Sequence, residues 1–315
     1  MASSTVDLAP APPRLEATSP RYGEKAIKAF LLLCAVLSVA TTAGIILSLL
    51  EPTVEFFGQV GFGDFFLKSE WFPGNGRDFG VQPLLVGSLN VALWAMVVAI
   101  PLGLGAAVYL SEYASRRVRK AVKPVLEILA GIPTVAIGLF GVTAVTPWLV
   151  DHWPGEFLGG PPGFFNALAA AICLGLMATP IVSSVSEDAM SSVPSGLREG
   201  AYALGASRMR VATRVVFPAA LSGVVASIVL AISRVVGETM IVLMVAGNNP
   251  NLTLNPVEAV QAITAYMGIQ ATGDAPPGTP EYGALFSVGA LLFAITFSIN
   301  LISIRLVRRF REVYE

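Results

Sequence analysis

Six long apolar stretches set the main constraint on how this chain can fold. Each is long enough to cross a lipid bilayer as a helix, which takes about 20 mainly apolar residues. Charged residues make up only 13% of the chain, whereas a typical soluble domain carries about 25%. The sequence therefore predicts an all-α, multi-pass membrane protein with six transmembrane helices. The stretches are Ala29–Leu50, Pro83–Tyr113, Pro124–Val150, Gly163–Ser184, Pro218–Ala246 and Ala284–Leu306.

The lysines and arginines between these stretches predict the topology. Of the 20 in the chain, all but three lie before the first stretch, after the last one, or in the loops 114–123 and 185–217. Lys68 and Arg77 both lie in the loop 51–82, and Arg234 lies inside a stretch. Because positive loops stay in the cytoplasm, we expect both termini and the loop 185–217 there.

Composition also divides the chain. Residues 1–23 are rich in Ala, Pro, Ser and Thr, which is typical of a disordered cytoplasmic tail. Residues 24–312 are expected to form one transmembrane domain with outer loops at 51–82 and 247–283. The aromatic, glycine-rich loop 51–82 is interpreted as an interfacial belt in preference to a specific protein contact.

The second outer loop contains a helix-start pattern. Asn255 can cap a helix, Pro256 suits its first position, and Glu258 can close a capping box. We expect a short surface helix that ends at Gly268. Its role could be to cover exposed helix ends or to meet a substrate-delivery protein.

The polar stretch 199–218, EGAYALGASRMRVATRVVFP, lies within and just after the loop 185–217. Small residues leave one helical face bare, so that another protein can approach the backbone. Gly205 should interrupt the helix, and Pro218 suits the first turn of the next one. The stretch is interpreted as a docking segment; an ordinary basic loop is the alternative. The candidate docking residues are Glu199, Gly200, Ala201, Gly205 and Pro218.

Two charges fall inside the fifth apolar stretch. Arg234 is expected near the middle of that helix, and Glu238, four residues on, on the same helical face. Charged residues are costly in a bilayer and usually functional, so we expect Arg234 to meet an anion while Glu238 compensates its charge. A structural ion pair is the alternative. Ser233, beside Arg234, joins the candidate pathway residues.

The third apolar stretch carries a charge and a break. Glu127 should lie in its first turn, against the positive end of the helix dipole. Gly131 and Pro133 should interrupt the helix, and Thr134 brings a hydroxyl to that point. Discontinuous helices often form substrate sites in transporters, although an ordinary proline kink is the alternative.

Several functions are not indicated. The chain has no phosphate-binding loop of the G-x-x-x-x-G-K-[ST] type, so ATP would have to be bound and hydrolysed by a separate subunit. Cys34 and Cys173 lie inside apolar stretches, which argues against a disulfide or a metal site. The single histidine, His152, is interpreted as a solvated loop residue. We expect no cofactor of the chain's own, no enzymatic activity and no nucleic-acid partner, with membrane lipid around it.

Four segments resemble one family. The stretch 199–218 matches the pattern E-A-A-x3-G-x9-I-x-L-P of importer-type ABC permeases, with Gly200 for the first Ala. Together with EILAGIPTVAIGLFG at 127–141, SRVVGETM at 233–240 and FGVQPLLVGSL at 79–89, it resembles the PstC permeases of phosphate-specific (Pst) ABC importers. The departures are Gly200 and Thr134, where the family often has Ala and Ser.

The resemblance implies a type I ABC importer permease fold and a heteromeric transporter in the inner membrane of a bacterium. Its expected partners are a second, PstA-like permease, a PstB-like ATPase dimer and a PstS-like extracytoplasmic phosphate-binding protein. It also implicates Arg234 and Glu238 in phosphate passage. The alternatives are import of another oxyanion such as molybdate or sulfate, an ion-coupled secondary carrier, or a scaffold that signals phosphate supply.

Overall fold

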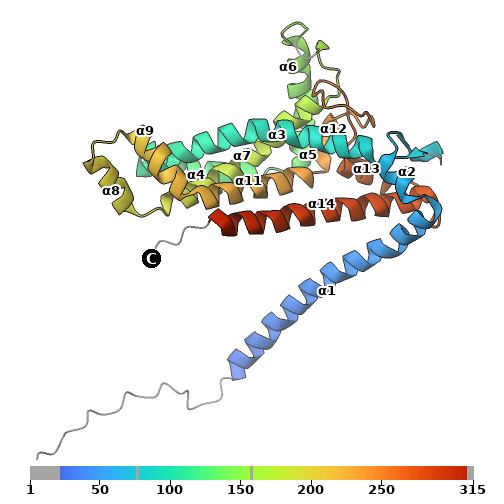
Figure 1. The fold of residues 1–315 in the computed structure, drawn as a ribbon, viewed down its shortest axis with the longest axis horizontal. Helices are drawn as coiled ribbons and strands as arrows, with labels where there is room; N and C mark the ends of the chain where they lie inside the picture. Colours follow the sequence, from blue (N-terminus) through green and yellow to red (C-terminus); the bar gives the residue numbers. More distant parts are fainter. Residues whose placement is uncertain (1–21, 76–77, 157–158, 311–315) are drawn as a thin grey trace, which may run out of the picture. The chain divides into compact units, whose positions relative to one another are not determined.

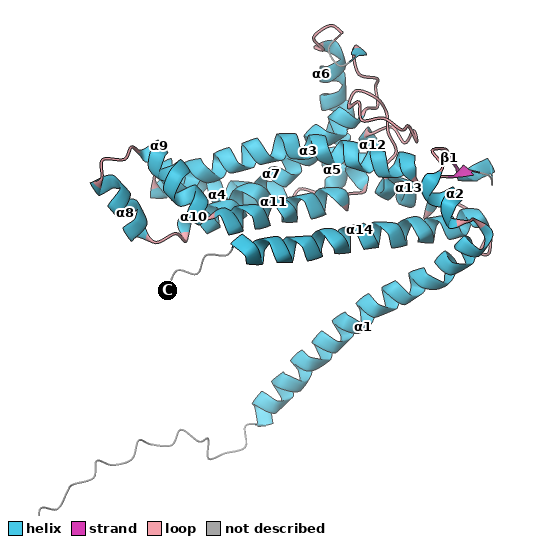
Figure 2. Ribbon diagram, in the orientation of Figure 1, coloured by secondary structure: helices cyan, strands magenta, loops and turns pink. Residues whose placement is uncertain are grey.

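The computed structural model describes residues 22–75, 78–156 and 159–310. Apart from its last two residues, the proposed disordered tail 1–23 lies outside the described residues. In the described part nearly every element is a helix, as expected (Figures 1 and 2). The exception is a small antiparallel hairpin of β1 (Trp71–Phe72) and β2 (Asp78–Phe79), in which Trp71 pairs with Phe79.

The contacts between residues divide the chain into two compact units, with the boundary between Ser48 and Leu49. Helix α1 (Tyr22–Gln59) supplies the described part of the first unit and the beginning of the second. It has 38 residues, so it is about 57 Å long at 1.5 Å per residue. It is therefore longer than the expected Ala29–Leu50 and reaches into the predicted outer loop.

Four long helices form the body of the second unit and lie side by side in Figure 1. Their bounds are α3 (Gln82–Val108), α7 (Ala167–Ser191), α11 (Leu221–Val236) and α14 (Pro280–Phe310). Glycine allows α3 and α7 to approach closely, since a Cβ at Gly175 would lie 2.8 Å from the carbonyl oxygen of Ala95. Helix α3 continues into a π-helical turn, η2 (Tyr109–Tyr113).

The third apolar stretch is not one helix. It forms α4 (Arg116–Ala130), α5 (Thr134–Phe140), a π-turn η3 (Gly141–Val145) and α6 (Thr146–Asp151). The expected interruption at Gly131–Pro133 is confirmed. The basic residues 116–123, expected in a loop, are helical because α4 begins directly after its N-cap Ser115. Glu127 consequently lies in the last turn of α4, and the prediction that it faces a positive helix end is wrong.

The fifth apolar stretch is also broken, so the prediction of one helix over Pro218–Ala246 is wrong. It forms α10 (Phe217–Ala219), α11 and α12 (Met240–Val245), preceded by a π-turn η5 (Ala212–Val216). The helical segments 208–219 and 221–236 meet at a bend of 73°. The described part of the chain has five helices long and apolar enough to cross a membrane, or six if this bent pair is one span.

Aromatic side chains pack together at the end of the bundle that carries α2 (Phe62–Leu67). Phe56, Phe65, Trp71 and Phe79 are all buried, and their rings meet mostly edge to face. These four side chains are therefore core residues, and the interpretation of the loop as an interfacial belt does not hold for them. Three other phenylalanines of the loop remain exposed: Phe62, Phe66 and Phe72.

The helix expected from Asn255 begins later. Helix α13 covers Ile263–Gln270, and its first four residues are buried, so it is not a surface helix starting at Asn255. The Asn255 side chain instead accepts a hydrogen bond from the Val257 N–H at 3.3 Å and donates one to Glu258 at 3.2 Å. These local bonds stabilise a turn, which is the usual competitor of a helix start at asparagine.

Candidate functional site

The docking segment folds as two short helices joined by a tight turn. Helix α8 (Ser195–Ala203) ends two residues before Gly205, and α9 (Arg208–Val211) follows. Gly205 has φ +77°, a left-handed conformation that glycine adopts without steric cost. The predicted interruption at Gly205 is confirmed. Leu204 beside it is 91% exposed, so the turn carries an apolar side chain on the surface.

The other docking candidates lie around this turn. Glu199 and Gly200 are exposed on α8, and Ala201 is half-buried. No atom lies within 4 Å of a Cβ built on Gly200 or Gly205. Pro218 is exposed in the first turn of α10, as expected. The segment thus has a bare backbone face that a second protein can approach.

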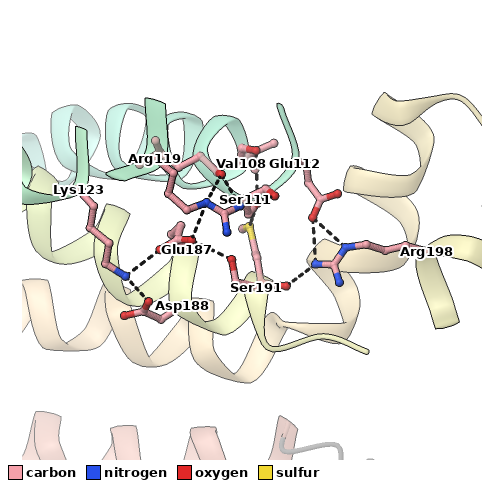
Figure 3. Close-up of polar contacts among 11 residues, drawn as sticks. Val108, Ser111, Glu112, Arg119, Lys123, Glu187, Asp188, Ser191 and Arg198 are labelled. Atoms are coloured by element: carbon pink, nitrogen blue, oxygen red, sulfur yellow. Dashed lines mark hydrogen bonds and ion pairs between the residues drawn. The ribbon is translucent and has the colours of Figure 1, made fainter. Parts of the chain in front are cut away.

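A buried ion pair holds the base of this segment (Figure 3). Arg198 of α8 bonds Glu112 of η2 through Nε at 3.2 Å and Nη2 at 3.0 Å. The side chain of Glu112 is 4% exposed and that of Arg198 is 19% exposed. The same guanidinium donates to the carbonyl oxygens of Met190 and Val193, where α7 ends.

A second polar cluster joins α4 to α7 (Figure 3). The carboxylate of Glu187, 3% exposed, lies 2.9 Å from Nζ of Lys123 and 3.5 Å from Nε of Arg119, and it accepts a hydrogen bond from Ser191. Lys123 also bonds Asp188, and this bond is the main reason why the pKa of Lys123 is raised above 10.5. Arg119 further donates to the carbonyl oxygens of η2.

These clusters were missed by the sequence reasoning, which counted Arg198, Arg119 and Lys123 only as cytoplasmic charges. The available signal was the acidic partner. Glu112 falls at the end of an apolar stretch and Glu187 lies just beyond another, where a carboxylate needs a cation when it is buried.

Arg234 lies in the last turn of α11, directly before the break at 237–239. Its side chain is exposed and makes no hydrogen bond or ion pair with the residues that the structure describes. The break removes the shared helical face on which Arg234 and Glu238 were expected, and the two charges are not paired. A positive charge at the C-terminal end of α11 is favourable for the helix dipole.

Glu238 has a structural role at the break. Its carboxylate accepts a hydrogen bond from the Met240 N–H at 3.1 Å, which caps the start of α12. Its carbonyl oxygen accepts one from the hydroxyl of Thr264, on α13, at 2.7 Å. The break is thereby fixed to the buried start of α13.

The remaining pathway candidates are separated. Ser233 donates to Asn300 of α14 at 3.1 Å. Thr134 is the first residue of α5, and no hydrogen bond joins it to Arg234 or Glu238 among the described contacts. The structure therefore does not gather the four candidates into one bonded cluster.

The two helix breaks are nevertheless related in space. Helices α5 and α12 begin directly after the breaks at 131–133 and 237–239, and they pack against each other. A Cβ on Gly138 would meet Ile241 and Met244, and one on Gly141 would meet Val245. Because the contacts advance along both helices together, α5 and α12 run in the same direction. Two interrupted spans, one with a free arginine at its break, are an arrangement in which transporters bind ions.

In the described part of the chain, no group of three or more His, Cys, Asp or Glu side chains could hold a metal ion.

A family comparison matches residues 99–312 to the model described as "Binding-protein-dependent transport system inner membrane component". Curated relatives are similar over most of their length. The chain is 32% identical over 267 residues to the "Probable ABC transporter permease protein YqgH" of Bacillus subtilis, covering 84% of both chains. It is 33% identical over 256 residues to the "Phosphate transport system permease protein PstC" of Xylella fastidiosa, covering 76% of both, and 30% identical over 296 residues to that of Haemophilus influenzae, covering 89% and 91%.

Solved structures share the fold. A bacterial ABC transporter that imports the acidic polysaccharide alginate matches with a TM-score of 0.59 at 18% identity, covering 91% of this chain and 99% of that one. An inward-facing MetNI methionine ABC transporter matches with a TM-score of 0.53 at 20% identity, covering 74% and 95%. The expected permease fold is therefore confirmed.

Proposed function

The chain belongs to the family of binding-protein-dependent transport system inner membrane components, and from this we propose that it forms half of an ATP-driven import pathway for inorganic phosphate. As a multi-pass membrane component of an ABC transporter it is a transport subunit. We place it in a bacterial inner membrane, beside a second, PstA-like permease. A PstB-like ATPase dimer would dock on residues 199–218 and bind the ATP, and a PstS-like protein would deliver phosphate on the other side.

The observation that carries the choice of cargo is Arg234, considered together with the similarity to PstC permeases. Its guanidinium is exposed at a helix break and has no ionic partner among the described residues. Arginine offers several N–H donors in a planar fork that matches the oxygens of phosphate. A charged group left unpaired inside a membrane span is costly, so its retention favours a role in binding an anion.

Glu238 contributes differently from the expectation of a simple partner. By capping α12, its carboxylate holds the break open without neutralising Arg234. Phosphate that leaves Arg234 would next meet the negative charge of Glu238, which favours release over tight binding. Ser233, next to Arg234 in the chain, and Thr134, at the start of α5, would supply hydroxyls to the pathway. Passage requires weak binding, because a site that holds its ion tightly slows transport.

The test is phosphate uptake by cells that lack this chain and are complemented with variants. Arg234→Gln should reduce the rate by about 10- to 150-fold, since hydrogen bonds to charged groups contribute about 1.5–3 kcal/mol. Arg234→Lys keeps the positive charge but not the planar fork of donors, so its uptake rate should lie between those of the parent and of Arg234→Gln. Arg305→Gln, which removes an exposed arginine of α14, is the matched control. Normal uptake by Arg234→Gln at a normal protein level would remove Arg234 from the mechanism.

The same system separates the alternatives. Inhibition of uptake by molybdate or sulfate at phosphate-like concentrations would point to another oxyanion. Transport by the purified chain alone in vesicles, without ATP, would indicate a secondary carrier. Retained phosphate signalling in a variant that moves no phosphate would indicate a scaffold.

A further inference from the structure

If an ATPase displaces the docking segment, as proposed above, the displacement of α8 must be transmitted to the rest of the protein through the contacts that α8 makes. The side-chain hydrogen bonds that leave α8 in the described structure all start from Arg198. They end on η2, which extends α3, and on the carbonyl oxygens at the end of α7. Arg198 therefore connects the docking segment to two transmembrane helices at once.

Arg119 repeats this arrangement with the two long helices exchanged. It donates to the carbonyl oxygens of Leu110 at 2.9 and 2.6 Å and of Ser111 at 2.8 Å, in η2, and it faces Glu187 of α7. Each arginine thus caps the end of one long helix and pairs with a carboxylate of the other. We call this arrangement the crossed arginine clamp; it consists of Arg119, Arg198, Glu112 and Glu187 (Figure 3).

A contribution to folding stability does not by itself explain why the protein has this clamp. Two carboxylates with side chains only 3–4% exposed must be desolvated, and buried ion pairs add little net stability compared with apolar packing. What the clamp provides is directional, multi-point attachment. The ends of α3 and α7 are held to each other and to α8, so neither can move without the other.

We propose that Arg198 and Arg119 are positioning residues through which a displacement of the docking segment is transmitted to α3 and α7 together. Arg198 receives the displacement from α8 and applies it to both helix ends. Arg119 keeps the two ends in register as they move. Loss of the clamp should leave the ATPase docked and active but disconnected from the transmembrane helices.

The test uses the assembled transporter in lipid nanodiscs, with the single variants Arg198→Gln and Arg119→Gln and with the double variant Arg198→Gln, Glu112→Gln. The double variant leaves no unpaired buried charge, so a failure to fold does not obscure the result. Lys120→Gln is the control for Arg119→Gln, because Lys120 is the next residue of α4 and is exposed. Three quantities are measured: basal ATP hydrolysis, its stimulation by the phosphate-loaded binding protein, and uptake.

The expected result is assembly and basal hydrolysis near those of the parent, with stimulation and uptake reduced about 5- to 150-fold in the double variant, the usual range of coupling between sites. Lys120→Gln should behave as the parent. Parent-like stimulation and uptake in the double variant would overturn the proposal and leave the clamp a purely structural feature.

A second readout does not depend on the cargo. A spin label at Leu102 on α3, after replacement of Cys34 and Cys173 by alanine, reports whether ATP moves this helix. ATP should change its spectrum in the parent but not in the double variant; an equal change in both would contradict the clamp's role. If the parent shows the ATP-dependent change yet no phosphate uptake, the proposed cargo fails while the clamp is still tested.

Discussion

The turn between α8 and α9 allows a sharp test of the docking segment, because Gly205 in that turn can be compared with Gly196 in the first turn of α8. Gly205 has φ +77°, whereas Gly196 in α8 has an ordinary helical conformation. No atom lies within 4 Å of a Cβ built on either residue. Alanine at these positions therefore meets no steric obstacle, so a clash of the new methyl group does not explain a difference between the two variants.

The cost of Gly205→Ala follows from its φ. A residue with a Cβ in the left-handed region loses roughly 1–2 kcal/mol, which reduces the population of the native turn about 5- to 30-fold relative to alternatives. Gly196→Ala should instead stabilise α8 by about 1 kcal/mol. Asparagine tolerates the left-handed region better than alanine, so Gly205→Asn should destabilise the native turn less than Gly205→Ala does.

The assay is a titration of the permease complex with its ATPase, with bound ATPase or stimulated hydrolysis as the readout. Because only the native turn should bind, the apparent dissociation constant should rise for Gly205→Ala in proportion to the lost population. Equal affinities for Gly205→Ala and Gly196→Ala would refute the claim that the left-handed turn presents the docking surface.

Three further predictions concern the bundle itself. Asn166→Ala removes the side chain that caps α7 through the Ala169 N–H at 2.7 Å, and it should lower the free energy of unfolding in detergent by about 1 kcal/mol. Gly175→Ala would place a methyl 2.8 Å from a carbonyl oxygen of α3 and should cost about 1–3 kcal/mol, whereas Gly105→Ala, with no neighbour within 4 Å, should not. Because the pKa of Lys123 is raised in the folded state, its contribution to the free energy of unfolding is complete below pH 10.5 and is lost as the pH rises through the higher folded-state pKa. Lys123→Met should therefore abolish this loss of stability at alkaline pH, as measured by unfolding at a series of pH values.

The sequence predicted the features that depend on local chemistry. Apolar length indicated the membrane helices, and the break at Gly131–Pro133 followed from proline. The interruption at Gly205 followed from the low helix propensity of glycine. Of the docking candidates, Glu199, Gly200, Gly205 and Pro218 are exposed and Ala201 is half-buried.

The break at 237–239 was not predicted because, although Gly237 caps the end of α11, the contacts that stabilise the break come from distant parts of the chain. Thr239 and Glu238 are compatible with a helix, and the apolar pattern continues to Ala246. The break is stabilised by the hydroxyl of Thr264, 26 residues away from Glu238, and by close packing of Gly268 on Thr239. A tertiary contact therefore overrode a continuous helical pattern, and with it the expected pairing of Arg234 and Glu238.

The use of charge as a loop signal was the other source of error in the predicted elements. Residues 116–123 were assigned to a loop because lysine and arginine indicate the cytoplasm. Both residue types are good helix formers, and α4 places Arg119 and Lys123 against α7 while Lys120 remains exposed. Counting charges gives the side of the membrane on which a segment is expected, but only their helical spacing shows which of them have partners.

The crossed arginine clamp also constrains how the sequence can evolve. A mutation of Glu112 alone leaves a guanidinium without its carboxylate, and a mutation of Arg198 alone leaves the reverse. Lineages should therefore pass from one pairing to another through a compensating second change, so that positions 112 and 198 covary among homologous sequences. Position 120, one residue from the clamp, should drift freely by comparison.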